Sequence, residues 1–141
     1  MPMFLTEVSP LAVIIAALLN IVLGSIWFAP FVFGRIWLQD LGRPISDSDK
    51  YSNEGMGPTY GILALASLII AYILGVLVIR FEAMTFWQGA QLGFWLWLGL
   101  IAPVKLNDVL FGGRTQRMFL IDIGFYLTSI VLMGGLLAIF R

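Results

Sequence analysis

The chain has 141 residues, of which 60% are hydrophobic and only 11% are charged, and its formal net charge is zero. Soluble domains have roughly half apolar and a quarter charged residues, so this composition indicates a protein dissolved in the lipid bilayer. The neutral charge balance gives no reason to expect a nucleic-acid partner. The sequence has no cysteine and no histidine, which excludes disulfides, thiolate or imidazole metal ligands, and imidazole catalysis. We expect neither a metal nor a cofactor.

Four apolar runs are long enough to cross a bilayer. Each would extend over roughly 27–33 Å at about 1.5 Å per residue, which matches the thickness of the hydrocarbon layer. Backbone amides in lipid must be paired within their own segment, so we expect helices. The predicted spans are residues 11–28, 59–79, 86–104 and 119–140. The predicted fold is therefore all-α, a single four-span transmembrane helix bundle over residues 1–141.

The stretch after the first span has a pattern of its own. Pro30 lacks a backbone donor and disfavours helix at Ala29, so the first span should end or kink there. Beyond it, Phe33, Trp37 and other apolar residues recur at helical spacing, with Arg35 on a different face. This pattern predicts a short interfacial helix over about residues 31–42. The polar residues that follow, about 43–58, are typical of a cytoplasmic loop.

Basic residues are distributed unevenly between the two predicted sides of the membrane. The connections after the first and third spans carry six lysines or arginines, against two on the opposite side. Basic connections favour the cytoplasm. We therefore expect a multi-pass protein of the cytoplasmic (inner) membrane of a bacterium, with both termini extracytoplasmic. The six residues are Arg35, Arg43, Lys50, Lys105, Arg114 and Arg117.

Small residues recur at intervals of four in every span, for example Gly89 and Gly93 in the third and Gly134 and Ala138 in the fourth. Helices in lipid associate by close packing, and small residues let their backbones approach. These stripes have two interpretations, contacts within one bundle or an interface between copies of the chain. We expect most of the stripes to form contacts within the bundle. At least one should face a partner subunit, so we expect a homo-oligomer, with a dimer favoured.

Asn20 is the most informative polar residue, because it lies near the middle of the first span, where an unpaired amide is costly. Its role is open between two interpretations. As a structural residue it would form hydrogen bonds with polar side chains at similar depth, namely Ser67, Gln91, Thr128 or Ser129. As a functional residue it would line a pathway or bind a small polar ligand. The candidate pathway or ligand-lining residues are Asn20, Trp27, Gln91 and Ser129.

Charged residues gather near the predicted cytoplasmic ends of the third and fourth spans. The candidate interfacial charge cluster consists of Arg35, Lys105, Asp108, Arg114, Arg117 and Asp122. Ion pairs that fix the hairpin are one interpretation. The other is a pair of catalytic aspartates, Asp108 and Asp122, in a membrane-interface hydrolase or peptidase. That chemistry needs two carboxylates that converge in a water-filled pocket, and KLNDVLFGG and FLIDIGFY contain no peptidase signature.

The central parts of the predicted spans contain no aspartate, glutamate, lysine or arginine. Proton- or cation-coupled transporters commonly keep an ionisable residue there, so this absence speaks against coupled transport. The preferred function is non-enzymatic, as an oligomeric channel, a passive transporter or a membrane accessory subunit. The aspartate-dependent enzyme is the alternative. The residues identify the lipid bilayer as a partner but name no small-molecule or ion ligand.

One longer motif resembles a known family of small bacterial four-helix membrane proteins, domain-of-unknown-function family 1761. Its first part consists of Asn20, Gly24, Trp27, Phe28, Pro30, Phe33, Gly34, Arg35 and Trp37, followed by Leu41 and Gly42. Its second part consists of Leu120, Asp122, Gly124, Tyr126, Met133 and Gly134. The resemblance covers nearly the whole chain and implies an integral membrane location with four helices. It implies no reaction, substrate or partner.

Overall fold

The computed structural model describes residues 8–41 and 57–140, and within these ranges every regular element is helical and no strand occurs. The predicted all-α fold is confirmed. In chain order the elements are α1 (Pro10–Trp27), the π-helical turn η1 (Pro30–Gly34), α2 (Arg35–Leu41), α4 (Gly57–Arg80), α5 (Phe86–Leu96), the π-helical turn η2 (Trp97–Ile101), α6 (Ala102–Leu110) and α7 (Gln116–Ile139).

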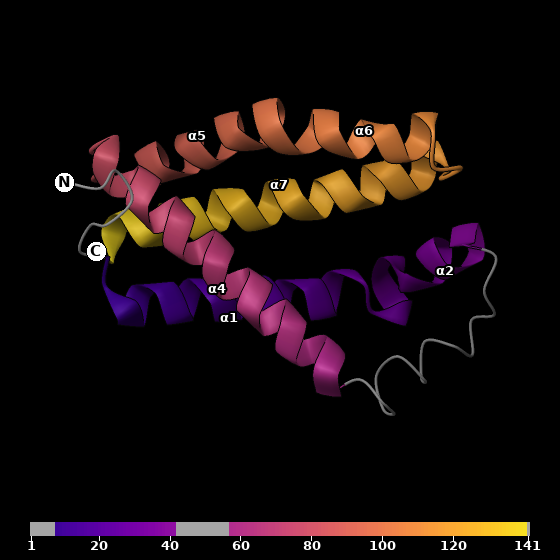
Figure 1. Ribbon diagram of the computed structural model, residues 1–141, viewed down its shortest axis with the longest axis horizontal. Coiled ribbons are helices and arrows are strands. Elements are labelled where there is room, and N and C mark those ends of the chain that lie inside the picture. Colours follow the sequence, from indigo (N-terminus) through magenta and orange to yellow (C-terminus); the bar gives the residue numbers. More distant parts are fainter. Residues whose placement is uncertain (1–7, 42–56, 141) are drawn as a thin grey trace.

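Four helical segments are long and apolar enough to cross a membrane, namely Pro10–Trp27, Pro58–Arg80, Phe86–Leu110 and Gln116–Ile139. The third of them is one continuous rod made of α5, η2 and α6. Figure 1 shows α7 between this rod and α1, with α4 crossing the bundle diagonally. The predicted four-span bundle is therefore confirmed, and the chain is a multi-pass membrane protein. The short α2 lies at one end of the bundle and contacts α7.

The two Ala-Pro pairs have different effects on the backbone. At Pro30 the helix is interrupted, because Ala29 is extended with φ −64° and ψ 146°. At Pro103 the rod continues instead, and it ends at Leu110 rather than near residue 104. A proline ring clashes with the preceding turn of a regular α-helix. Here that turn widens into η2, where the Ala102 N–H donates to the Trp97 carbonyl and lets the helix pass the proline.

The predicted interfacial helix over residues 31–42 corresponds to η1 and α2, which together cover Pro30 to Leu41. The predicted polar loop at 43–58 lies outside the described residues, except that residues 57 and 58 begin α4. Gly34 closes η1, where its N–H donates to the Ala29 carbonyl at 2.9 Å. A Cβ at Gly34 would overlap the Phe28 carbonyl oxygen, so this tight turn requires glycine.

The closest helix contact joins α5 and α7 through three glycines. A Cβ built on Gly89 would overlap the Gly134 carbonyl oxygen, and a Cβ on Gly134 would overlap the Gly89 carbonyl oxygen. A Cβ on Gly93 would likewise overlap the Ile130 carbonyl oxygen. The two backbones therefore touch, which only glycine permits in this register. The stripe predicted from the sequence is used inside one chain.

Small residues also join α1 to the core. Ala12 and Ala16 of α1 are buried, as is Ala71 of α4. The core around them is completed by larger side chains such as Leu74 and Met133. The helix α4 packs in this way only from Ser67 onwards, because residues 58–66 are exposed, apart from the half-buried Ala64. The first half of α4 therefore diverges from the bundle, as Figure 1 shows.

Replacing Gly89 by alanine tests the backbone contact between α5 and α7. We expect Gly89→Ala to lower the free energy of unfolding by about 1–3 kcal/mol, because the new methyl group must push the two backbones apart. The measurement is unfolding by sodium dodecyl sulfate in mixed micelles, followed by circular dichroism.

Gly61→Ala is the matched control, because a Cβ at Gly61 of α4 meets no atom within 4 Å. Alanine favours helix over glycine by about 0.5–1 kcal/mol, so this variant should be as stable as the original chain or slightly more stable. Equal loss of stability in both variants would contradict the contact.

Candidate functional site

A closed polar network lies at the centre of the bundle. The Asn20 side-chain amide donates to Ser67 Oγ at 2.8 Å, and Ser129 Oγ donates to Asn20 Oδ1 at 2.5 Å. All three residues are at least 92% buried, with exposed fractions of 8%, 0% and 3%. The network joins α1, α4 and α7, and no buried side-chain nitrogen or oxygen among the described residues lacks a partner. Asn20 therefore acts as a hydrogen-bonded junction between three helices.

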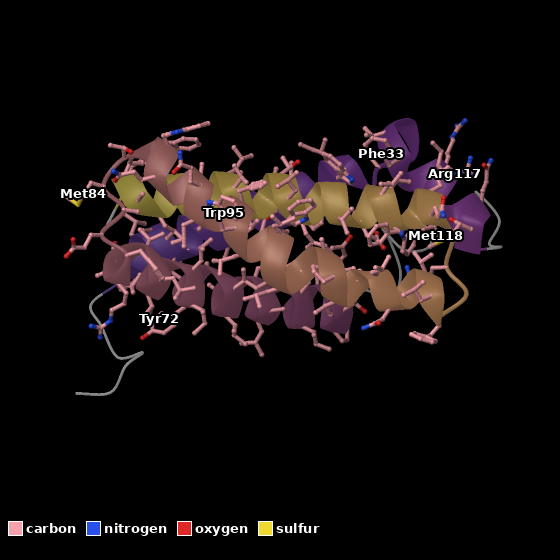
Figure 2. All side chains as sticks on the ribbon, turned by 90° about the horizontal axis from the view of Figure 1, so that it is seen from above. Phe33, Tyr72, Met84, Trp95, Arg117 and Met118 are labelled. Carbon is pink, nitrogen blue, oxygen red and sulfur yellow. The ribbon has the colours of Figure 1, made fainter. Side chains whose placement is uncertain are left out.

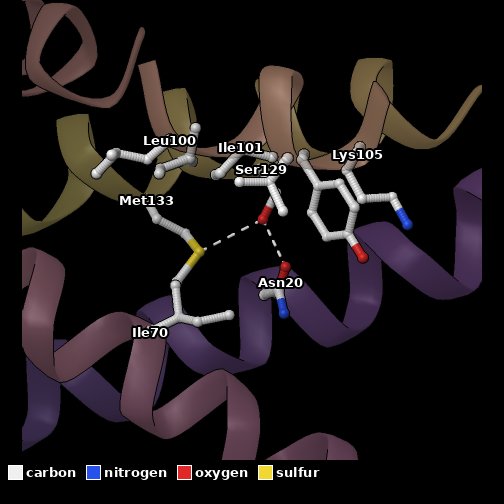
Figure 3. A pocket seen from close by; sticks show the side chains of 10 residues that line it. Asn20, Ile70, Leu100, Ile101, Lys105, Ser129 and Met133 are labelled. Carbon is white, nitrogen blue, oxygen red and sulfur yellow. Dashed lines mark hydrogen bonds between the residues drawn. The ribbon is translucent and has the colours of Figure 1, made fainter. Parts of the chain in front are cut away.

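A groove of about 320 Å³ opens beside this network, between the rod, α4 and α7. Its rims are apolar and exposed, since Leu100 and Val104 on the rod are 66% and 61% exposed. Its floor is buried and includes Asn20 and Ser129 (Figure 3). We call it the lateral groove. Its lining residues are Asn20, Ile70, Leu100, Ile101, Val104, Lys105, Tyr126, Ser129, Ile130 and Met133.

A charge cluster lies at one end of the lateral groove and consists of Lys105, Asp108, Arg114 and Asp122. Lys105 Nζ is 2.8 Å from Asp108 Oδ2 and 4.0 Å from Asp122 Oδ2. Arg114 Nη1 is 3.6 Å from the same Asp122 oxygen. Asp122 is only 6% exposed, and a buried carboxylate of this kind requires nearby cations and donors. The charge cluster supplies them from α6 and from the turn before α7.

Three tryptophan side chains surround the second turn of α7, and we call them the tryptophan clamp. They come from α1, α2 and η2, and each donates its indole N–H to α7. The pairs are Trp27 with the Ile121 carbonyl at 3.0 Å, Trp37 with Asp122 Oδ1 at 3.1 Å, and Trp97 with the Ile123 carbonyl at 2.8 Å. Indole is a donor only, and a partly buried indole needs an acceptor. The clamp therefore fixes η2 and α2 against α7.

Asn20 and Ser129, two of the predicted pathway residues, hydrogen-bond to each other, but the structure places the other two elsewhere. Trp27 belongs to the tryptophan clamp, and Gln91 is exposed on α5. Ser67 was among the partners expected for Asn20, and it forms that hydrogen bond.

The predicted charge cluster is also partly assembled. Lys105, Asp108, Arg114 and Asp122 come together. Arg35 and Arg117 are exposed at the starts of α2 and α7. Sequence reasoning missed the Trp37–Asp122 bond. The sequence offers only general signals for this bond. Indole is always a hydrogen-bond donor, and Asp122 lies inside a predicted span, where a carboxylate needs a donor.

The described residues contain no group of three or more His, Cys, Asp or Glu side chains that could hold a metal ion. The two carboxylates of the charge cluster both face the Lys105 ammonium. A catalytic aspartate pair instead shares a proton between two adjacent carboxyl groups. The arrangement is chemically suited to holding helices together and to meeting an external anion through its cations.

Four apolar spans around a closed polar network define an α-helical integral membrane protein. A family model matches residues 11–138, and its description is Protein of unknown function (DUF1761). This chain belongs to the DUF1761 family, which confirms the resemblance seen in the sequence. Neither the curated proteins nor the solved structures gave a match to the chain. The family description names no activity, so function must be argued from the geometry.

Replacing Asn20 tests whether the polar network is a structural junction. We expect Asn20→Leu to lower the free energy of unfolding by about 1–2 kcal/mol, since it removes two interhelical hydrogen bonds and leaves two hydroxyls without this partner. The measurement is again unfolding by sodium dodecyl sulfate in mixed micelles.

The triple variant Asn20→Leu, Ser67→Ala, Ser129→Ala is the informative comparison. It removes the stranded hydroxyls together with the amide, so it should regain part of the lost stability. A triple variant less stable than Asn20→Leu alone would show that the cost of Asn20→Leu does not come from unpaired hydroxyls.

Proposed function

We propose that this protein is a non-enzymatic accessory subunit of the bacterial cytoplasmic membrane, which acts by binding within the bilayer. The observation that carries the proposal is the closed network of Asn20, Ser67 and Ser129. These polar groups at the bundle centre hydrogen-bond one another and leave little for a passing solute. What the molecule offers to its surroundings is a set of surfaces, and the lateral groove is one of them.

A channel or passive transporter needs a continuous line of polar groups facing water. The deep polar side chains Asn20, Ser67 and Ser129 instead bond to one another, and Gln91 is exposed on α5. The central parts of the described spans also contain no charged residue that could attract an ion. Both observations favour an accessory role over conduction.

The enzyme alternative used Asp108 and Asp122 as acid and base. Lys105 Nζ contacts Asp108 at 2.8 Å and faces Asp122 at 4.0 Å, and Trp37 donates to the other oxygen of Asp122. These contacts support an ion-pair role for both carboxylates, because each is engaged by a donor rather than by the other carboxyl group. The geometry therefore favours the non-enzymatic function.

A homodimer remains part of the proposal. Since Gly89, Gly93 and Gly134 are used inside the chain, we expect a dimer to form through other, exposed residues. The first half of α4 offers them, with Ile62 and Leu65 exposed by 70% and 59%. Such residues can equally face lipid. The mass of the assembly therefore decides whether they contact a second copy of the chain.

Reconstitution into vesicles tests the proposed function. Purified protein in vesicles should leave potassium, proton and glycerol permeation at the rates of protein-free vesicles, because the deep polar side chains of the described spans bond to one another. Gramicidin serves as the conducting control. The same sample should show the mass of two chains by native mass spectrometry.

A permeation rate that rises with protein content, and that Asn20→Leu abolishes while the helical circular dichroism signal is kept, would overturn the accessory role and favour a pathway. A rise that Asp108→Asn or Asp122→Asn abolishes, with Asn20→Leu without effect, would place such a pathway at the charge cluster.

The proposed orientation puts both termini outside the cell, since the basic connections favour the cytoplasm. Met84 lies in the turn between α4 and α5, at the end of the bundle opposite Arg117 (Figure 2). The chain contains no cysteine, so single-cysteine variants can be labelled without background. Met84→Cys should react with a membrane-impermeant maleimide in intact cells. Phe111→Cys, which is 86% exposed at the other end, should react only after permeabilisation, and the reverse pattern would invert the topology.

A further inference from the structure

We propose that the lateral groove binds one acyl chain of an anionic phospholipid, with the phosphate of its headgroup held by Lys105. The inference deepens the accessory function, on which it rests, because it assigns a ligand class to the lateral groove, one of the surfaces through which that function would act. It rests on the form of the groove, on the chemistry of its floor and on the position of the lysine.

The form of the groove fits a ligand that arrives from the bilayer. Its volume of about 320 Å³ lies at the lower end of ligand pockets, which measure roughly 300–1,000 Å³. Its rims are Leu100 and Val104 on the rod and Ile70 on α4, and these are between 44% and 66% exposed. All three belong to segments that can span the membrane. The groove therefore opens sideways at the depth of the hydrocarbon layer.

The chemistry of the floor selects hydrocarbon. Asn20 donates to Ser67 and accepts from Ser129, so the two polar residues of the floor already have partners. Met133 and Ile130 supply apolar floor beside them. A polar ligand would lose its water and gain few hydrogen bonds in return, which is unfavourable. An acyl chain loses nothing on leaving the surrounding lipid and gains close packing.

The position of Lys105 selects an anionic headgroup. Its side chain lies at one end of the groove, and Met133 and Ile70 lie towards the other (Figure 3). A lysine ammonium has three donors. Asp108 takes one at 2.8 Å, whereas Asp122 at 4.0 Å is beyond hydrogen-bond distance. Two N–H groups can therefore meet a phosphate, and basic pockets between transmembrane helices bind lipid headgroups in this way.

The site also lies where a lipid headgroup is found. The Lys105 amine, which α6 supplies, lies 4.0 Å from Asp122 in the second turn of α7. The same amine lies 5.9 Å from the centre of the Tyr126 ring. A lysine stem lies along apolar surface while its amine reaches towards the headgroup layer. The hydrocarbon part of the groove then extends from Lys105 towards the bilayer centre, as an acyl chain does.

Lipid titration followed by native mass spectrometry tests the proposal. The full-length protein, stripped of lipid in a non-ionic detergent, is titrated with dioleoyl phosphatidylglycerol and, separately, with dioleoyl phosphatidylcholine. We expect the apparent Kd for the first bound phosphatidylglycerol to be about fivefold lower, the effect of one lysine near a membrane surface. Lys105→Gln should make the two lipids equal, and Lys105→Arg should keep the preference.

A variant that fills the groove tests the acyl-chain part of the proposal independently of the headgroup part. Val104→Trp places an indole on the rim and should weaken both lipids. Leu106→Trp, on the same helix but outside the groove lining, is the matched control and should bind both lipids as the original chain does. Thermal unfolding in the same detergent checks that each variant is folded.

Three results would overturn the proposal. They are equal affinity of the original chain for the two lipids, equal binding by the two tryptophan variants, and binding of glycerol 1-phosphate as tight as that of the whole lipid. The last result would identify an anion site without an acyl-chain groove. None of them depends on permeation through vesicles, so the accessory function and the lipid site can fail separately.

Discussion

Every polar group inside the hydrocarbon layer must find a partner in the protein, and the arrangement of this bundle depends on that constraint. The Asn20 amide meets it by bridging Ser67 and Ser129, which fixes α1, α4 and α7 at one depth. Asp122 meets it at one end of α7 with Trp37 and two cations. Hydrophobic burial cannot choose one arrangement of helices over another in lipid. Pairing of polar groups and close backbone contact therefore determine which helices are neighbours.

The lateral groove follows from the unequal packing of the four spans. Glycines let α5, the first part of the rod, lie directly against α7. On the other side, α4 packs from Ser67 onwards, through residues such as Ala71 and Leu74. The residues before Ser67 diverge, and the groove stays open between Ile70 of α4 and Val104 of the rod, beside Ser129. The groove is thus the geometric consequence of one tight contact and one helix that crosses at an angle.

The sequence predicted those features that depend on composition and spacing. Four spans, the helix after Pro30 and the small-residue stripes that include Gly89 and Gly134 all follow from local patterns. That these two stripes meet inside one chain is shown only by the structure. Asn20 was recognised as buried, and Ser67 and Ser129 were among its expected partners. The effect of Pro103 was not predictable in the same way, because a π-helical turn depends on how the rod packs on α7. The tryptophan clamp was missed in part because Trp27 and Trp37 lie at predicted span ends, where aromatic residues are usually explained by the membrane interface.

The Asp122 carboxylate links the tryptophan clamp to the proposed lipid site. Asp122 receives Trp37 on one oxygen and faces Arg114 and Lys105 with the other. Lys105 already lines the groove, and its 4.0 Å distance to Asp122 is beyond a hydrogen bond, so the nearer partners of Asp122 are Trp37 and Arg114. Arg114 also lies 5.9 Å from the Trp37 ring, so both nearer partners involve that indole. The short α2 is therefore joined to α7 through the same carboxylate that faces Lys105.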